Sequence, residues 1–256
     1  MEIARTAGSA AAASLVTLAF AAGAALGQVP PAAPAAQLVA TPGPTPVPIG
    51  TTTVKLPEPR AKSATSVEEA LRGRTAPRTF ATDPVTLGEV SQLLWAAQGI
   101  TGKYSKFSRR AAPSAGGLFP LEVILVAANV TGLPPAVYRY RSETHDLVRI
   151  GEGDRRPAIA DACHFQALAG VPAIFVITTV ESRTAKAYGD RAPKYVALEA
   201  GAASQDLSLE AVALDLGCGM LIEFEVPKLA KAIGTRPDET PFTVLAVTRP
   251  ETTPQS

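Results

Sequence analysis

The chain has 256 residues, a formal net charge of +1 and only 5% aromatic residues. A charge balance this close to neutral argues against the broad basic surface of a nucleic-acid-binding protein, and it favours no acidic partner. The length fits one large domain or two small ones.

The N-terminal segment differs in kind from the rest of the chain. No charged residue occurs between Thr6 and Val54, and the Ala-rich run Ala7 to Gly27 follows a short start that contains Arg5. This pattern predicts a signal peptide over residues 1–27 and export to the periplasm or another extracytoplasmic space. Retention of the run as a membrane anchor is the second interpretation, because its length suffices to span a bilayer. A disordered extension is the third.

The next segment, residues 28–62, is rich in Pro, Ala and Thr, which predicts a disordered linker. We expect the folded domain to begin near Ser63 and to occupy residues 63–250, with a short tail over 251–256. Two capping boxes mark its first helices, Ser66 with Glu69 and Thr86 with Glu89. Apolar residues on one face extend the second helix to a stop at Gly99.

A glycine-containing turn precedes the first long apolar strand. The turn is Pro113, Ser114, Ala115, Gly116 and Gly117, and the strand is Leu121 to Ala128. Small side chains and paired glycines let main-chain N–H groups approach a flat or anionic ligand without a Cβ in the way. An ordinary turn before a buried strand is the alternative on these residues alone.

The remaining pattern mixes strands and helices without regular βαβ repetition, which predicts one α+β domain. Alternating residues predict a hairpin, and further apolar runs predict core strands. The expected strands are 136–141, 147–150, 173–180, 220–224 and 242–247; the expected helices are 154–168, 192–216 and 226–233. Apolar residues cover most of the circumference of the 192–216 helix, so we expect it to be buried in a core or a subunit interface.

The cysteines and histidines indicate no metal site. Cys163 and Cys218 lie in apolar stretches, where small buried thiols are commoner than disulfides, although export would permit a disulfide. His145 and His164 are the only histidines, and neither has a second ligand at a useful spacing.

Four stretches of the chain resemble the flavin-dependent nitroreductase family, and within it the SagB-type dehydrogenase branch. They are Arg72–Phe80, Leu93–Thr101, Pro113–Val123 and Glu199–Gly217. The resemblance covers about residues 66–249. It implies a nitroreductase-like fold with a central mixed or antiparallel sheet flanked by helices. It also implies a homodimer that holds each FMN at the subunit interface.

The resemblance implies a set of cofactor contacts. Cations would hold the FMN phosphate, while apolar walls and main-chain donors would hold the ring. The residues at matching positions are Arg74, Arg78, Pro113, Ser114, Ala115, Gly116, Gly117, Gln205, Gly217, Ile222, Glu223 and Arg249. A solvated surface role is the alternative for each arginine.

Several positions depart from the family pattern. Thr75 and Ala76 replace an arginine and a serine at the expected phosphate site, and Ala202 and Asp206 replace a histidine and an asparagine in the central helix. After Gly217, the bulky and acidic Met220–Glu225 stretch stands where the family offers a small residue. Glu223 near a flavin would disfavour its anionic reduced state.

These features predict an FMN-dependent oxidoreductase that works by ping-pong hydride transfer on a nitro, quinone or azoline compound. Lys194 and Tyr195 resemble the Lys-Tyr pair to which the SagB-type branch assigns proton transfer. A solvated lysine beside a packing tyrosine is the interpretation we favour for that pair on physical grounds. Because nicotinamide donors are scarce outside the cytoplasm, an exported enzyme would use a quinone, a redox protein or the substrate itself as electron partner.

Two other functions compete with this hypothesis. A non-catalytic, dimeric binding module that has lost FMN explains the substitutions at Thr75, Ala76, Ala202, Ile222 and Glu223. A serine hydrolase using Ser114 is a poor third, because Ser114 lacks the glycine-flanked nucleophile elbow.

Overall fold

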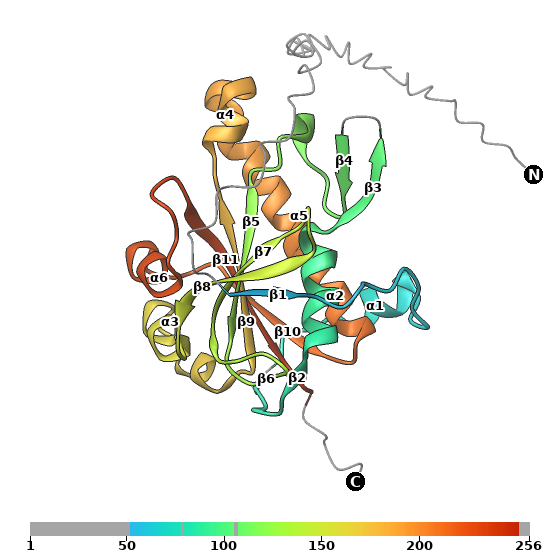
Figure 1. Ribbon diagram of the computed structural model, residues 1–256, viewed down its shortest axis with the longest axis vertical. Helices are drawn as coiled ribbons and strands as arrows, with labels where there is room; N and C mark the ends of the chain where they lie inside the picture. The colour runs from blue at the N-terminus through green and yellow to red at the C-terminus, as the bar shows by residue number, and fades with distance from the viewer. Residues whose placement is uncertain (1–51, 78, 105–106, 251–256) are drawn as a thin grey trace, which may run out of the picture. The chain divides into compact units, whose positions relative to one another are not determined.

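A large antiparallel sheet forms the centre of the computed structural model, which describes residues 52–77, 79–104 and 107–250 (Figure 1). The chain divides into two units, residues 1–35 and 36–256, and every described residue belongs to the second. Within the described residues the sheet has seven strands in the order β1-β8-β7-β5-β9-β11-β10, with every neighbouring pair antiparallel. Its strands are β1 Thr53–Lys55, β5 Leu121–Ala127, β7 Ala136–Arg141, β8 Asp146–Glu152, β9 Ala173–Thr179, β10 Gly217–Leu221 and β11 Thr240–Thr248.

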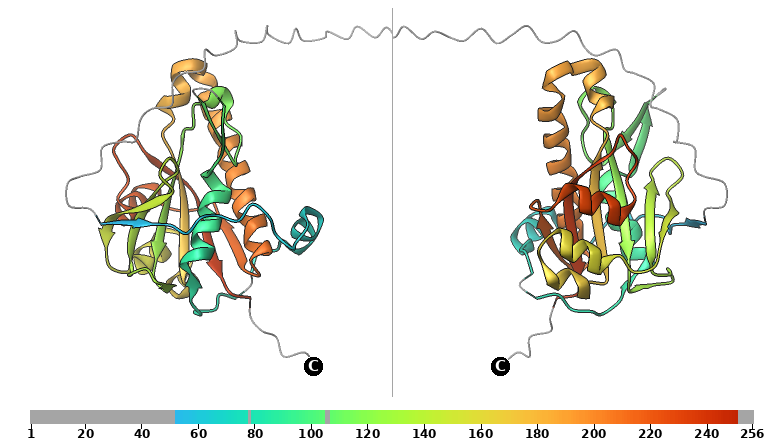
Figure 2. Two further views of the ribbon diagram at one scale, coloured as in Figure 1. Left: turned by 45° about the vertical axis from the view of Figure 1, so that its right-hand side comes forward. Right: turned by 90° about the vertical axis from the view of Figure 1, so that its left-hand side faces the viewer.

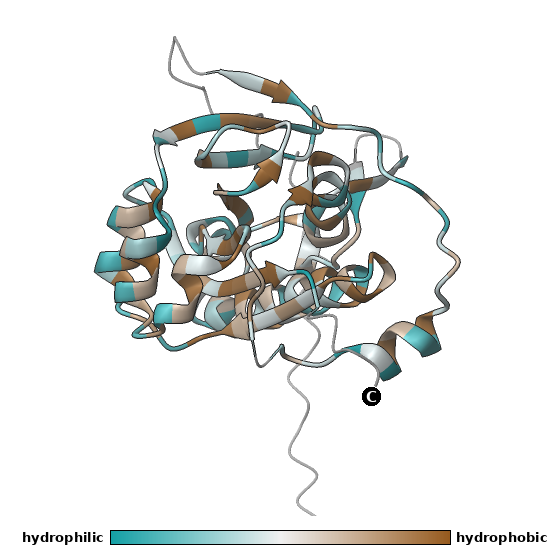
Figure 3. Cartoon of the chain, turned by 90° about the horizontal axis from the view of Figure 1, so that it is seen from below, coloured by the Kyte–Doolittle hydropathy of each residue, from teal (hydrophilic) through white to brown (hydrophobic). Residues whose placement is uncertain are grey.

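Helices cover both faces of this sheet, and alternation along the strands explains the two cores. On β5, Leu121, Val123 and Leu125 face the core shared with α2 and α5, while Ile124 and Val126 face the core shared with α3 and α6. Figures 1 and 2 show these helix pairs on opposite sides of the strands. Hydrophobic and hydrophilic residues alternate along the helices and strands, as elements that bury one face require (Figure 3). The helices are α1 Val67–Gly73, α2 Leu87–Gln98, α3 Arg156–Ala162, α4 Ser182–Tyr188, α5 Ala192–Ala213 and α6 Val226–Ile233.

Smaller elements complete the description. Two short two-stranded sheets pair β2 with β6 and β3 with β4. These elements are β2 Val85–Thr86, β3 Ile100–Tyr104, β4 Phe107–Arg110, β6 Val130–Thr131, and the 3-10 turns η1 Ala115–Gly117, η2 Gln166–Gly170 and η3 Gly189–Arg191. Within the described ranges, no helix is both long enough and apolar enough to cross a membrane.

Local sequence signals placed most elements correctly. Both capping boxes form: Ser66 accepts from the Glu69 N–H, and Thr86 accepts from the Glu89 N–H. The predicted hairpin is β7–β8, the predicted core strands are β5, β9 and β11, and α6 has the predicted bounds. β10 is offset: it begins at Gly217 and ends at Leu221, where we expected 220–224.

The single helix expected over 154–168 is wrong. α3 ends at Ala162, and His164 adopts a left-handed φ of 50°. The Phe165 N–H then bonds to the Ala160 carbonyl at 3.0 Å, closing the helix as a left-handed C-terminal cap does. The chain continues into η2 as a separate turn.

The folded region begins earlier than the sequence predicts. β1 pairs with β8 inside the stretch expected to be linker, and Leu56 is buried. Ser91 on α2 donates to the Pro57 carbonyl at 2.6 Å, and the backbone of Arg60 bonds to the Gln92 side chain. Residues 53–60 therefore belong to the domain, because sheet pairing and α2 hold them. The proposed signal segment, linker residues 28–51 and the tail 251–256 lie outside the described residues.

The two cysteines are free and buried. Cys163 belongs to the α3–α6 core and Cys218 to the α2–α5 core, so the sheet separates them and no intramolecular disulfide forms. Burial raises the pKa of both thiols to about 11. They act as small hydrophobic groups, as the sequence favoured.

Candidate functional site

The Pro113–Gly117 turn and η1 carry the chain into β5 through three left-handed residues. Gly116 has φ 64°, Gly117 has φ 65° and Phe119 has φ 46°. Glycine adopts this region without the clash that a Cβ meets, so the two glycines permit the tight course of the backbone here. The sequence prediction of a close-approach turn is thus consistent with its geometry.

Glu199, on the buried face of α5, binds the turn through hydrogen bonds. Its Oε1 accepts from the Ala115 N–H at 2.8 Å, and Glu199 also hydrogen-bonds the Ser114 side chain. Only 5% of Glu199 is exposed. Burial raises the pKa of Glu199, while the Ala115 N–H, the Ser114 hydroxyl and the charge of Arg110 offset part of that rise.

Hydrogen bonds within the turn engage some of its main-chain N–H groups and leave others without an internal acceptor. Ser114 Oγ accepts from the Phe119 N–H at 2.9 Å, and the Gly117 N–H bonds to the Ser114 carbonyl at 3.1 Å. Among the hydrogen bonds of the described residues, none uses the N–H of Ser114 or of Gly116. These two main-chain donors are the ones that a ligand could engage.

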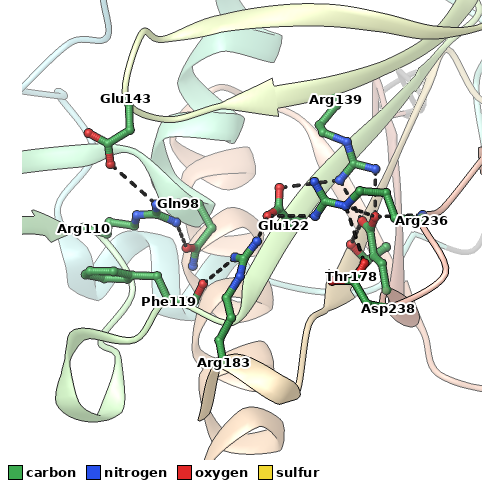
Figure 4. Close-up of polar contacts among 11 residues, drawn as sticks. Gln98, Arg110, Phe119, Glu122, Arg139, Glu143, Thr178, Arg183, Arg236 and Asp238 are labelled. Atoms are coloured by element: carbon green, nitrogen blue, oxygen red, sulfur yellow. Dashed lines mark hydrogen bonds and ion pairs between the residues drawn. The ribbon is translucent and has the colours of Figure 1, made fainter. Parts of the chain in front are cut away.

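Arg110 supports the turn from the β4 side (Figure 4). Its guanidinium lies 4.4 Å from the ring centroid of Phe119 and donates to Gln98 at 3.0 Å. Glu143 is 3.7 Å away. Burial lowers the pKa of Arg110, and the charge of Glu143 opposes that effect.

A group of partly buried ion pairs, the sheet-end cluster, lies at the same end of the sheet (Figure 4). Its members are Glu122, Arg139, Arg183, Arg236 and Glu239. Arg139 forks onto Glu239 with two bonds of 2.8 Å, and Thr178 donates to the same carboxylate. Arg183 bridges Glu122 and the Phe119 carbonyl, the latter at 2.8 Å, which ties the cluster to the turn.

Charge sets the ionisation of Glu122 in this cluster. Burial acts to raise its pKa, but the charges of Arg183 and Arg236 together with the Arg183 hydrogen bond outweigh burial and hold the pKa below its ordinary value. The cluster therefore keeps the Glu122 carboxylate ionised by pairing it with arginines.

The residues expected at the FMN phosphate lie at the opposite end of the sheet. Arg74 caps α1 with its N–H on the Ala70 carbonyl, and its exposed side chain forms no ion pair with a described residue. Pro77 lies against Gly217, where a Cβ would sit 3.4 Å from the proline ring, and the charge of Arg74 reaches Cys218. Thr75 and Ala76 are exposed, and Arg78 is outside the described residues.

Arg249 has a partner inside the protein. Its two Nη atoms lie 2.8 and 2.9 Å from the carboxylate oxygens of Glu89, and its Nε donates to the Pro84 carbonyl at 3.3 Å. Glu89 is also the partner of the N-cap residue Thr86 in the capping box of α2. A phosphate would have to compete with the Glu89 carboxylate for Arg249. No pattern in the sequence predicted this ion pair.

The turn and Arg249 are far apart within one protomer. Leu121 pairs with Thr179, which pairs with Thr240, so the turn lies at the start of β11. Arg249 follows Thr248 at the far end, and eight steps of a strand span about 27 Å. Figure 1 shows the same separation along the sheet. The expected site residues thus form two groups, not one.

The remaining expected residues lie on exposed surface near the turn's end of α5 and beyond β10. Lys194 and Gln205 are exposed on the outer face of α5. The Tyr195 ring packs against Tyr188 in a tilted arrangement, with ring centroids 4.4 Å apart. The pair thus consists of an exposed lysine and a tyrosine that packs against a second tyrosine. Past β10, Ile222 is 66% exposed and Glu223 is also exposed.

Sequence reasoning missed the supports of the turn. Glu199 lies on the buried face of α5 between Val196 and Ala203, and a carboxylate at such a position is a detectable signal of a buried partner. Arg110 and Arg183 carry no comparable signal, because their partners lie on other elements. Among the described residues no three metal-ligating side chains form a group that could hold a metal.

The seven-stranded antiparallel sheet with helices on both faces, and the glycine turn braced by α5, define a class of protein. The model of the Nitroreductase family matches residues 71–248, and the chain belongs to that family. A protein of Methanocaldococcus jannaschii named as a candidate nitroreductase is 32% identical over 169 residues, which cover 64% of this chain and 84% of that protein.

Solved structures share the fold at lower identity. A candidate nitroreductase of Ralstonia eutropha superposes with a TM-score of 0.69 at 24% identity, covering 83% of this chain and 98% of the other. The E. coli microcin synthetase complex with a truncated pro-microcin bound gives a TM-score of 0.61 at 19% identity, covering 69% of each chain. A candidate nitroreductase of Desulfovibrio desulfuricans in complex with FMN gives 0.52 at 19% identity, covering 74% of this chain and 88% of that one. Below 25% identity these matches show the fold alone.

Proposed function

We propose that the protein is an FMN-dependent oxidoreductase of the nitroreductase family. The observation that carries this proposal is the turn at Pro113–Gly117, which contains two left-handed glycines and is held by Glu199 through Ala115. The N–H groups of Ser114 and Gly116 stay out of the internal bonds of the described residues. Two main-chain donors on a surface without bulky side chains suit the polar edge of a flavin ring. The FMN bound to a protein of the same fold supports the choice of flavin.

The protein works as a homodimer in this proposal. The turn and the group of Arg74, Gly217 and Arg249 lie at opposite ends of one protomer, so one flavin meets both only if two protomers supply them. The outer face of α5 offers a surface for this contact: Leu198 is 63% exposed there, beside Gly201 and Gln205. Burial of that face by a second copy accords with the apolar character that the whole helix shows in sequence.

Bound FMN would supply hydride transfer, accepting a hydride from one substrate and passing it to the next in a ping-pong cycle. Arg74 would pair with its phosphate, and Gly217 would let the backbone of β10 approach it. Ser114 and Gly116 would donate to its ring. Glu223, exposed beyond β10, would disfavour negative charge on the reduced ring if it faced it.

The substrate class we propose is a nitro, quinone or azoline compound. Azoline-to-azole dehydrogenation, the reaction of the SagB-type branch, is supported by the sequence of the turn and by the fold shared with a microcin synthetase that binds a peptide. Lys194 and Tyr195 are then the proton-transfer pair. Exposure of Lys194 keeps it accessible to a substrate.

We also propose export, as the uncharged Ala7–Gly27 segment indicates. A fusion of residues 1–60 to a reporter active only outside the cytoplasm tests this. Reporter activity confined to the cytoplasm would reject export and make a nicotinamide the default electron donor.

One observation favours a second candidate function, a dimeric binding module without flavin. Arg249 is engaged by Glu89, and Thr75 and Ala76 offer no charge, so Arg74 is left as the main described cation at the expected phosphate site. A phosphate site with so few available cations would bind FMN weakly, as expected of a non-catalytic binding module.

The absorbance spectrum of the purified protein decides between the two functions. Bands of an oxidised flavin, with FMN identified by mass spectrometry and a dimer mass by light scattering, are expected of the enzyme. A colourless protein that takes up no added FMN would reject the oxidoreductase and support the binding module.

A further inference from the structure

We propose that Glu199 is a positioning residue whose carboxylate holds the Ser114–Ala115 segment in shape for its ligand and places a negative charge behind it. This inference rests on the proposed function for the identity of the ligand, FMN. It assigns to α5 a role beyond packing: the helix supplies the acceptor that shapes the binding turn.

The directions of the hydrogen bonds show which form of Glu199 fits. The Phe119 N–H donates to Ser114 Oγ, so the hydroxyl hydrogen of Ser114 is free to point to Glu199. The Ala115 N–H donates to Glu199 Oε1. Both groups therefore donate to the carboxyl, and an ionised carboxylate accepts them without needing a proton of its own.

The surroundings of Glu199 concentrate its effect on the turn. In the described part of the chain it takes part in no ion pair, and its neighbours on the buried face of α5 include Val196, Ala200 and Ala203. A buried carboxylate without a salt-bridge partner depends mainly on its hydrogen bonds for compensation, and the charge of Arg110 makes a smaller contribution. Its bonds go to the turn, so the turn and the carboxylate stabilise each other.

Two separable effects follow from this arrangement. Holding the turn requires an acceptor at Oε1, which an amide also provides. Placing charge behind the turn requires the carboxylate itself. Glu199→Gln keeps the first and removes the second, whereas Glu199→Ala removes both. Glu210→Gln is the matched control, because Glu210 is another α5 carboxylate whose pKa burial raises, yet its partners are Gln92 and Arg60, away from the turn.

The first measurement needs no cofactor. Hydrogen exchange of peptides covering residues 113–119 in the apo protein should speed up at least tenfold in Glu199→Ala, since the Ala115 N–H loses its acceptor. Glu199→Gln and Glu210→Gln should stay within about threefold of wild type. Unchanged exchange in Glu199→Ala would overturn the positioning role, whether or not the protein binds flavin.

The second measurement adds FMN. Glu199→Ala should bind FMN about tenfold or more weakly, as expected for loss of a charged hydrogen-bond acceptor. Glu199→Gln should bind within about threefold of wild type, yet its flavin midpoint potential should become more positive, because loss of a nearby negative charge favours the reduced anion. A purely structural role would leave that potential at the wild-type value, as in Glu210→Gln.

The outcomes are distinguishable from failure of the proposed function. Wild-type protein that binds no FMN rejects the oxidoreductase and the charge effect, while the exchange measurement still decides the positioning role. FMN binding with equal affinity and potential in all variants overturns the inference and leaves the oxidoreductase standing. If Glu199→Ala does not fold, the flavin midpoint potential of Glu199→Gln against that of Glu210→Gln decides, because hydrogen exchange is expected to be alike in these two variants.

Discussion

The two ends of the sheet differ in how they are held. At the end where β5 begins, Glu199, Arg110 and the sheet-end cluster fix a turn from three sides. At the end where β11 finishes, Arg74 is exposed and Arg249 is bound to Glu89. The turn is therefore firmly held, whereas the far end offers one exposed arginine and one arginine already engaged. If FMN binds as we propose, its ring would meet a preorganised turn and its phosphate would meet little available charge. The comparison teaches that binding at the two ends can be gained or lost separately.

The largest effect is expected at the turn's end, on stability. Glu239→Ala removes a carboxylate whose side chain is fully buried and leaves Arg139 without its fork. Breaking one side of a buried pair costs about 3–5 kcal/mol. Urea unfolding followed by circular dichroism measures the loss. Asp238→Ala, at an exposed neighbour, is the control and should stay within about 0.5 kcal/mol; equal stability of both variants would contradict the importance of the cluster.

The next effect tests the far end directly. Arg74→Ala should weaken FMN by about one to two decades, since a charge-assisted hydrogen bond contributes roughly 1.5–3 kcal/mol. Riboflavin, which has no phosphate, should lose much less. Flavin fluorescence titration measures both, with Arg72→Ala on the same helix as control. If FMN and riboflavin weaken equally, Arg74 does not contact the phosphate.

A smaller effect of opposite sign sharpens the comparison. Glu89→Gln should release Arg249 while keeping an acceptor for the Thr86 N–H, and FMN affinity should rise about threefold to tenfold. The gain should vanish in the double variant Glu89→Gln with Arg249→Ala. A gain that persists without Arg249 would show that the fork does not restrain a phosphate ligand.

The smallest effect is a pH dependence at the turn's end. The pKa of Glu122 is held below its ordinary value of 4.5 by Arg183 and Arg236 against the opposing effect of burial. Ionised Glu122 therefore contributes stability that is fully present above pH 4.5 and declines as the pH falls through the lowered folded-state value. Urea unfolding at several pH values measures this decline, which Glu122→Gln should reduce. A Glu122→Gln profile parallel to wild type would argue against this assignment.

The sequence predicted features that depend on nearby residues. The Ser66 and Thr86 boxes, the glycine turn and the β7–β8 hairpin are local, so spacing and residue type suffice to find them. The family resemblance added the fold, which the family match confirms.

The partners of the site residues were beyond the reach of the sequence. Glu89 and Arg249 are 160 residues apart, and Arg139 meets Glu239 across 100 residues. Such pairs depend on strand order and register, which no local pattern encodes. The sequence did not predict β1 for a related reason. Its three residues lie in a Pro-rich stretch and form a strand only because they pair with β8.

The placement of β1 also decides where the chain can be cut. β1 is an edge strand of only three residues and carries Lys55. Short edge strands with lysine discourage pairing with strands of other molecules. A protein shortened to begin at residue 63 would lose this edge strand. The backbone hydrogen-bonding groups on this edge of β8, where Leu147 and Val148 are buried, would then be unpaired. Aggregation of such a fragment would reflect the unpaired edge of β8 and would carry no information about flavin binding.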